Sequence, residues 1–285
     1  MSALYDRLGI TRQGMHARAK AEWTKHQQRQ VLIQRARAAR KDHPGMGCRR
    51  LYGQIDTGGL PGRDACERML LAAGFGIAKP RRSFTKAGKD VVGNLAEGLR
   101  MERPCQLWQT DITYVWSGGR WRYASFMLDV YTRQILAHRL SDRLDAACQV
   151  DLFNAAVRAT KPNAGLIVHT DRGVQYTSAE WRQALARHGA VPSMARCAWE
   201  NAYCERVHRT IKEEYLKWWP HGRPAELGRS LALAVRRYNT SRHHSGLPGK
   251  QPPDQFAGAW RQGRHPDFSF RIWSKLTQTD TLHIN

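Results

Sequence analysis

Three acidic residues stand at positions of this sequence where a carboxylate could do chemistry. Asp111 interrupts the apolar and aromatic stretch WQTDITYVW (108–116), and Asp171 follows the apolar run LIVHT (166–170). Glu205 lies in a third stretch, ENAYCERVHRTIKEEYL. A charge in mid-strand is costly unless it is paired or binds a metal ion, and open α/β sheets place ligand groups just beyond the carboxyl ends of their strands. Each acid alone has an ordinary structural explanation, but the three together indicate a site.

Three carboxylates that converge from two strands and a helix would make a hard, oxygen-rich site. Mg²⁺ and Mn²⁺ prefer such ligands. Two ions about 3.5–4 Å apart can activate a nucleophile and stabilise the leaving oxygen in phosphodiester displacement. Arg172 could then reach a phosphate, and Gly173 would let the backbone turn sharply beside the ions. The pattern therefore predicts two Mg²⁺ or Mn²⁺ ions held by Asp111, Asp171 and Glu205.

The elements that must position these acids are predicted from periodicity and turn signals. Alternation and β-branched or aromatic residues favour strands over 106–116, 120–131 and 133–141, with Gly118 and Gly119 as a hairpin turn. Further strands are expected at 165–170 and 191–195. Helices are expected at 142–160, 178–189 and 200–219, the second capped by Ser178 and closed by Gly189. This order predicts an α/β fold, a mixed sheet with helices on its faces.

The helix over 200–219 can be divided into faces by its period. An apolar stripe is expected to face the sheet, formed by Cys204, Val207, Ile211 and Trp218. A neighbouring face carries Glu205, Arg209 and Lys212 at helical spacing. A carboxylate for a metal ion and cations for phosphates would suit this arrangement.

The charge of the chain indicates a polyanionic partner. Lys and Arg number 46 against 24 Asp and Glu, a net charge of +22, and such a balance is typical of nucleic-acid-binding proteins. Residues 1–100 hold 20 basic and 8 acidic side chains, residues 101–205 hold 12 and 10, and residues 206–285 hold 14 and 6. The excess therefore lies on the flanks, around a nearly neutral middle.

The N-terminal flank reads as small basic helices. Residues 4–23 are predicted to form two short helices about Gly9, of helix-turn-helix size, with Thr11 able to cap the second. Stronger helices are expected at 27–41, from Arg49 and Arg50 onward, and at 62–74. A small helical bundle with an exposed basic face is the alternative to a DNA-binding unit. Residues 79–93, basic and without periodicity, are predicted to be a linker.

Other classes of protein fit less well. The six cysteines include no CxxC pair and the twelve histidines are scattered, so neither a zinc site nor a disulfide framework is expected. No apolar run is long enough for a membrane span and the start lacks a secretion leader. We therefore expect a cytoplasmic protein, associated with the nucleoid if it binds DNA.

Several ordered stretches resemble one family, the insertion-sequence transposases with a retroviral-integrase-like catalytic core, of the type encoded by the second of two overlapping frames. They are WQTDITYVW, FMLDVYTRQILAHRLS, VHTDRGVQYTS, SMARCAWENAYCERVHRTIKEEYL and RYNTSRHHSGLPGKQPPDQF, covering about 105–256, with RKDHPGMGCRRLY near the N-terminus. The resemblance implies a ribonuclease H-like core with a mixed five-stranded sheet flanked by helices. It also implies an Asp-Asp-Glu triad at Asp111, Asp171 and Glu205, and DNA contact by Lys212. Arg236 and Arg237 would lie near the DNA.

One spacing departs from the family pattern. The 33 residues between Asp171 and Glu205 are slightly fewer than in the commonest members, and the shortening falls in the loop MARCAWEN (194–201). Glu200 is therefore an alternative third ligand. It would sit before the helix, without Lys212 at the right distance, so Glu205 is preferred.

The sequence thus predicts a DNA transposase in four parts: a helical DNA-binding region (1–78), a basic linker (79–104), the catalytic core (105–218) and a basic C-terminal helical region (219–285). Its expected partners are double-stranded DNA, as terminal inverted repeats and target, and a second copy of itself. The resemblance also suggests an upstream-frame partner protein. A ribonuclease H-like nuclease without strand transfer and a domesticated DNA-binding regulator remain the alternatives.

Overall fold

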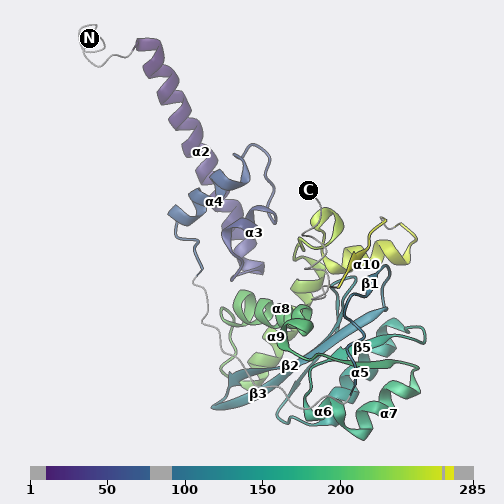
Figure 1. Cartoon of the computed structure of the whole chain (residues 1–285). Coiled ribbons are helices and arrows are strands. Elements are labelled where there is room, and N and C mark those ends of the chain that lie inside the picture. The colour runs from purple at the N-terminus through teal and green to yellow at the C-terminus, as the bar shows by residue number, and fades with distance from the viewer. Residues whose placement is uncertain (1–10, 78–91, 265–266, 273–285) are drawn as a thin grey trace. The chain divides into compact units, whose positions relative to one another are not determined.

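The computed structural model describes residues 11–77, 92–264 and 267–272. The chain divides into two compact units, residues 1–80 and 81–285, which are described separately (Figure 1). The predicted helix pair at 4–23 lies partly, and the predicted linker at 79–93 mostly, outside the described residues.

The first unit is built on one long helix, α2 (Arg12–Asp42). The Thr11 hydroxyl caps it by accepting from the Gly14 N–H at 3.0 Å, as predicted. The prediction of a separate helix at 27–41 is wrong, because these residues form the second half of α2. No proline interrupts residues 12–42, so nothing in the backbone ends the helix between the two predicted segments.

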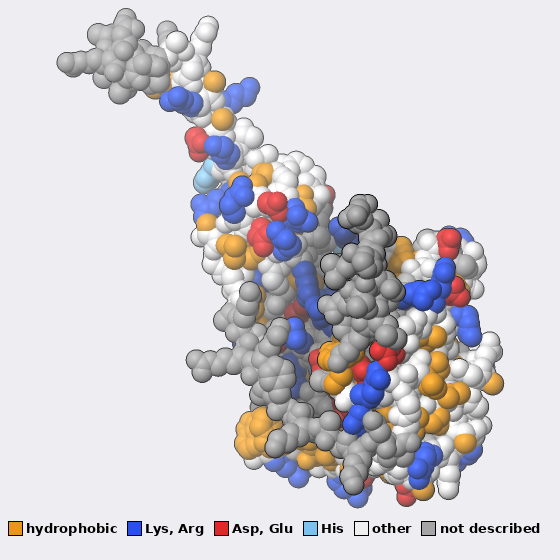
Figure 2. All heavy atoms as spheres, viewed as in Figure 1, with side chains coloured by type: hydrophobic (Ala, Val, Ile, Leu, Met, Phe, Trp, Pro, Cys, Tyr) orange, Lys and Arg blue, Asp and Glu red, His pale blue; other side chains and the backbone are white. Residues whose placement is uncertain are grey.

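Two short helices, α3 (Cys48–Tyr52) and α4 (Arg63–Ala72), pack on the second half of α2. The core of this unit is small, with Leu32, Leu51 and Leu70 fully buried. Nearly all side chains from 13 to 30 are exposed, and Figure 2 shows Lys and Arg side chains along this part of α2. The first unit is thus a small helical bundle that extends a basic helix into solvent.

The second unit contains the predicted mixed sheet, in the order β4-β3-β2-β5-β6. The strands are β2 (Leu107–Ser117), β3 (Arg120–Asp129), β4 (Ile135–Ser141), β5 (Ile167–Thr170) and β6 (Val191–Met194). The first three are antiparallel, whereas β5 and β6 run parallel to β2. Gly118 and Gly119 have φ of 62° and 78°, so the predicted hairpin turn is confirmed.

Helices cover both faces of this sheet. One face carries α5 (Ala146–Thr160), α6 (Val174–Thr177) and α7 (Ala179–Arg187), with a core around Trp108, Phe153 and Trp181. The other face carries α8 (Ala202–Thr210), the π-helix η2 (Ile211–Leu216) and α9 (Pro224–Thr240). Helix α9 therefore packs with the core, although it belongs to the predicted C-terminal region.

The remaining elements were not expected from the sequence. Strands β1 (Arg100–Met101) and β7 (Phe270–Arg271) form a second small sheet. The 3-10 turns η1 (Ala198–Asn201) and η3 (Pro248–Lys250) and the helix α10 (Pro253–Arg261) complete the unit. Two-residue strands carry no readable periodicity, which explains why they were missed. None of the described helices has the length and apolar character that crossing a bilayer requires.

Candidate active site

Asp111 on β2 and Asp171, the residue directly after β5, lie at the same level of two neighbouring parallel strands. Gln109 of β2 pairs with His169 of β5, and each aspartate follows two residues later in its own chain segment. Two residues restore the side-chain direction along a strand, and adjacent strands lie about 4.8 Å apart. The two carboxylates are therefore brought together at the carboxyl end of β5, as the sequence predicted for Asp171.

Burial disfavours the charged form of both aspartates. The pKa of Asp111 is raised to about 8, first by burial and then by the negative charges of Asp171 and Glu205. A hydrogen bond of 2.7 Å from the Ile112 N–H opposes this shift. Burial also raises the pKa of Asp171, against a 3.0 Å hydrogen bond from the Gly173 N–H. A divalent cation would relieve this cost.

Glu205 lies in the first turn of α8, half-buried. Burial raises its pKa, and the positive charge of Arg209 opposes that rise. Its charge acts on Asp111, so it lies within electrostatic reach of the aspartates. Among the described residues, however, no three His, Cys, Asp or Glu side chains are already gathered closely enough to hold a metal ion. The Glu205 carboxylate is therefore near Asp111 and Asp171, but the three carboxylates do not surround a common point.

His208, one turn after Glu205, was missed by the sequence reasoning. Its Nδ1 lies 3.6 Å from Asp111 Oδ2, and its Nε2 is buried without a hydrogen-bond partner. Burial, followed by the charge of Lys212, lowers the pKa of His208 to about 3, so the ring is neutral at physiological pH. The signal was present, because a residue three positions after Glu205 on a helix shares its side.

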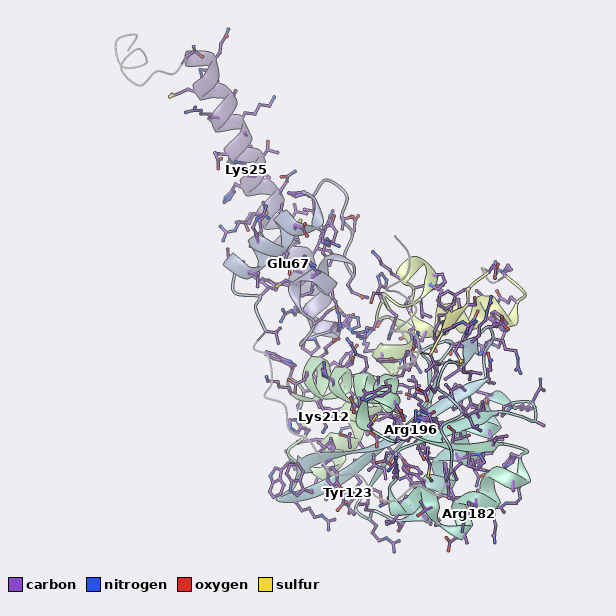
Figure 3. The ribbon with its side chains drawn as sticks, in the orientation of Figure 1. Lys25, Glu67, Tyr123, Arg182, Arg196 and Lys212 are labelled. Carbon is purple, nitrogen blue, oxygen red and sulfur yellow. The ribbon has the colours of Figure 1, made fainter. Side chains whose placement is uncertain are left out.

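Lys212 comes one further turn along, in η2 (Figure 3). The side chain is half-buried, and burial lowers its pKa, while the charges of Glu213 and Asp111 act in the opposite direction. The predicted face with Glu205 and Lys212 therefore does approach the aspartates.

The predicted apolar stripe of this helix is only partly correct. Cys204, Val207 and Ile211 are buried, but Trp218 is 46% exposed. The helix changes to a π-helix at Ile211, and the Lys217 N–H bonds to the Lys212 carbonyl five residues back. The wider turn shifts the phase of all later residues, so that Tyr215 and Leu216 are buried instead.

Comparisons with known proteins identify the family to which the chain belongs. Two models of the integrase core domain match the chain, over residues 101–198 and 192–253. An IS600 insertion-element protein of 31 kDa from Shigella sonnei is 30% identical over 230 residues, which are 76% of this chain and 82% of that protein. The chain belongs to the insertion-sequence transposases with an integrase core.

Two further similarities describe how far the likeness extends. The transposase of the insertion sequence IS904 from Lactococcus lactis subsp. lactis (strain IL1403) is 34% identical over 154 residues, 53% of this chain. The matched region spans only 61% of that relative. The HTLV-2 integrase catalytic core domain, solved in complex with magnesium, is 17% identical with a TM-score of 0.43, covering 50% of this chain and 92% of that one.

The Glu200 carboxylate is occupied by another partner, Arg196. Its two carboxylate oxygens accept hydrogen bonds from the backbone and guanidinium of Arg196, at 2.6–3.2 Å. Burial would raise the pKa of Glu200, but the hydrogen bonds and charge of Arg196 hold it below its ordinary value. Glu200 is therefore engaged in holding the loop before α8, which favours Glu205 as the third acid.

The predicted DNA-contact arginines differ in their surroundings. Arg172 donates from Nε to the Ala195 carbonyl at 3.0 Å, and Arg49 pairs with Glu67 at 2.9 Å. Arg50 and Arg209 are exposed. On α9, Arg236 is exposed and Arg237 is half-buried.

Gly173 has a different role from the predicted one. Its φ is −59°, a value open to any residue, so it does not make a sharp glycine turn. A Cβ at this position would lie 2.7 Å from Gln175 Oε1 and 3.0 Å from Asp171 Oδ1. A larger residue here would therefore push aside the ends of the Gln175 and Asp171 side chains.

Proposed function

We propose that this chain is a DNA transposase that cleaves the 3′ ends of its insertion sequence and joins them to target DNA. The observation that carries the proposal is the meeting of Asp111 and Asp171 at one level on adjacent parallel strands, with Glu205 within electrostatic reach. Membership of the transposase family supports the same activity.

In the first reaction, water attacks a phosphorus at the element's end and the P–O3′ bond breaks, which frees a 3′-hydroxyl. In the second, this hydroxyl attacks a phosphorus of the target and displaces a target 3′-hydroxyl. Neither reaction needs a covalent link between the enzyme and DNA. Each needs the nucleophile and the leaving oxygen to be held in line beside concentrated positive charge.

The oxygen ligands of Asp111, Asp171 and Glu205 suit Mg²⁺ or Mn²⁺, and binding two ions would require Glu205 to come closer to the aspartates. Three carboxylates supply hard oxygen ligands, and cations would offset the burial and the neighbouring negative charges that raise the pKa of Asp111. When bound, such ions activate the attacking hydroxyl and stabilise the leaving oxygen. Asp111 and Asp171 would hold them from the sheet, and Glu205 would close the site from α8.

DNA would reach this site along basic side chains. Lys212, whose charge acts on Asp111, would contact a phosphate of the element's end, together with Arg172 and Arg209. Terminal inverted repeats would be gripped by the first unit, where Arg49 and Arg50 lie on α3, and by Arg236 and Arg237 on α9. Pairing two ends in a synaptic complex would require at least a dimer, with an upstream-frame product as a further possible partner, acting on the bacterial nucleoid.

The test is a cleavage and strand-transfer assay with duplex oligonucleotides that carry the element's ends, in Mg²⁺ and in Mn²⁺. The wild type should produce both the nicked end and the joined product. Asp111→Asn, Asp171→Asn and Glu205→Gln should each abolish both products while the duplex is still bound. Glu200→Gln is the matched control, and it should retain cleavage in a folded protein.

Other outcomes would favour other functions. Cleavage without any joined product would indicate a nuclease of the same fold. Tight binding of the ends with no cleavage in either metal would indicate a DNA-binding regulator. Full activity in Glu205→Gln together with loss in Glu200→Gln would overturn the choice of the third acid.

A further inference from the structure

The side chain of Gln109 joins the strand of Asp111 to the helix of Glu205. It is fully buried on β2, two residues before Asp111. Its Oε1 accepts from the Cys204 N–H at 3.3 Å, and its Nε2 donates to the Glu200 carbonyl at 3.2 Å. One amide therefore bonds to both ends of the turn that leads into α8.

Asn201 makes the reciprocal connection. Its side-chain Nδ2 donates to the carbonyl of Thr110 on β2 at 3.2 Å, in a site where Asn201 is 2% exposed. It stands at the N-cap of α8 but does not cap the helix with its own side chain. The cap acceptor for the Cys204 N–H comes instead from Gln109, 95 residues away in sequence.

We propose that Gln109 and Asn201 are positioning residues that fix the distance between Asp111 and Glu205. Their three hydrogen bonds join residues 109 and 110, directly before Asp111, to residues 200, 201 and 204, directly before Glu205. The inference rests on the proposed function, since the purpose of that distance is to hold divalent ions between the two acids.

These hydrogen bonds can control the distance between Asp111 and Glu205 because they lie close to both acids in the chain. Glu205 is already near the aspartates without closing on them, so a small shift of α8 decides whether it can share an ion. Loss of a group that orients a metal ligand costs about 10–100-fold in metal affinity or activity. A displacement of about 1 Å can cost about 100-fold in rate.

The experiment compares two amide-to-leucine variants. Gln109→Leu removes the connection between β2 and α8. Asn239→Leu is the matched control, because the Asn239 amide joins α9 to β4 in the same way, bonding the Ile135 N–H and carbonyl at 2.9 and 2.8 Å. Both variants lose an amide that spans a helix and a strand, fully buried at Gln109 and half-buried at Asn239. Only Gln109 lies next to one of the acids in the chain.

Two quantities are measured on the full chain. The first is the Mn²⁺ concentration that half-saturates the thermal shift, without DNA. The second is the cleavage rate of an end-carrying duplex in Mg²⁺ and Mn²⁺. Gln109→Leu should raise the Mn²⁺ midpoint and lower the rate, each by about 10-fold or more, and end-DNA affinity should be unchanged. Asn239→Leu should lose stability but keep the wild-type Mn²⁺ midpoint.

Asn201→Ser serves as a second variant if Gln109→Leu does not fold, and it should shift the Mn²⁺ midpoint in the same direction. Equal Mn²⁺ midpoints in wild type, Gln109→Leu and Asn201→Ser would overturn the inference, even if all three differed in stability. If the midpoints are equal but the wild type binds Mn²⁺ and cleaves DNA, only the inference fails and the proposed function stands. A wild type with neither metal response nor cleavage contradicts the proposed function itself.

Discussion

Replacing the central acid should make the protein more stable while it destroys activity. In the absence of divalent ions, burial and the charges of Asp171 and Glu205 raise the pKa of Asp111 from 3.8 to about 8. Asp111→Asn removes the charge, and the asparagine Oδ1 can still accept from the Ile112 N–H. We therefore expect Asp111→Asn to raise the melting temperature of metal-free protein.

The magnitude follows from linkage between protonation and folding. A difference of one pH unit in pKa corresponds to about 1.4 kcal/mol. From 3.8 to pH 7 is 3.2 units, so the folded state carries a penalty of about 4 kcal/mol at pH 7. The side chain keeps 19% of its surface exposed, and water that reaches it reduces the penalty to about 2–4 kcal/mol.

The sign of the pH dependence is fixed by which state binds more protons. Between about pH 4 and pH 8, the folded chain keeps a proton on Asp111 that the unfolded chain has lost. The contribution of Asp111 to the stability of the wild type therefore falls as the pH rises from about 4 to about 8. The gain from Asp111→Asn should be small near pH 4 and largest at pH 8.

The assay is thermal denaturation in EDTA at pH 5 and pH 8, followed by tryptophan fluorescence. For a unit of this size, about 1 kcal/mol shifts the melting temperature by about 2–4 °C, so Asp111→Asn should gain about 5–15 °C at pH 8. Saturating Mg²⁺ should reduce the difference in melting temperature between Asp111→Asn and the wild type, because it stabilises only the wild type.

Asp151→Asn is the control, because Asp151 is exposed and pairs with Arg139 at 3.0 Å. Such pairs contribute about 0–1 kcal/mol, so its melting temperature should change little. An Asp111→Asn protein that melts at or below the wild type at pH 8, or whose shift is equal at both pH values, would refute the reasoning.

Two further substitutions test the space beside Asp171 and the buried ion pair between Arg242 and Glu214. Gly173→Ala should fold with the wild-type melting temperature, since its φ of −59° suits alanine, but the new Cβ should displace the Asp171 carboxylate and lower the cleavage rate by about 10-fold or more. Arg242→Met should lower stability by about 3–5 kcal/mol in chemical denaturation, because Arg242 holds the buried Glu214 carboxylate with two hydrogen bonds of 2.9 and 3.0 Å. Adding Glu214→Met should recover most of that loss, and a double variant as unstable as Arg242→Met alone would contradict the argument.

Local pattern in the sequence was enough to predict most of the elements of the second unit. Alternation in 107–117, the two glycines of the hairpin and the Ser178 cap all act within a few residues, and the structure contains them. The positions of Asp111 in mid-strand and Asp171 after a strand are likewise local facts. Prediction was weakest where a boundary depended on packing, as in the single helix α2 and the two-residue strands β1 and β7.

The amino-acid order by itself determined which side of each strand and helix is apolar, and therefore which acids are carried toward the core. Only the tertiary structure decided what lies opposite them. The hydrogen bond between Gln109 and Cys204 and the approach of His208 to Asp111 join segments with no shared period. The π-helical turn at Ile211 was likewise decided only by the tertiary structure. It shifts the phase of the helix after Ile211, so that Tyr215 is buried in place of Trp218. Periodicity reports the direction of a side chain within its own element, whereas the distance between two elements depends on the packing and hydrogen bonds that form when they meet.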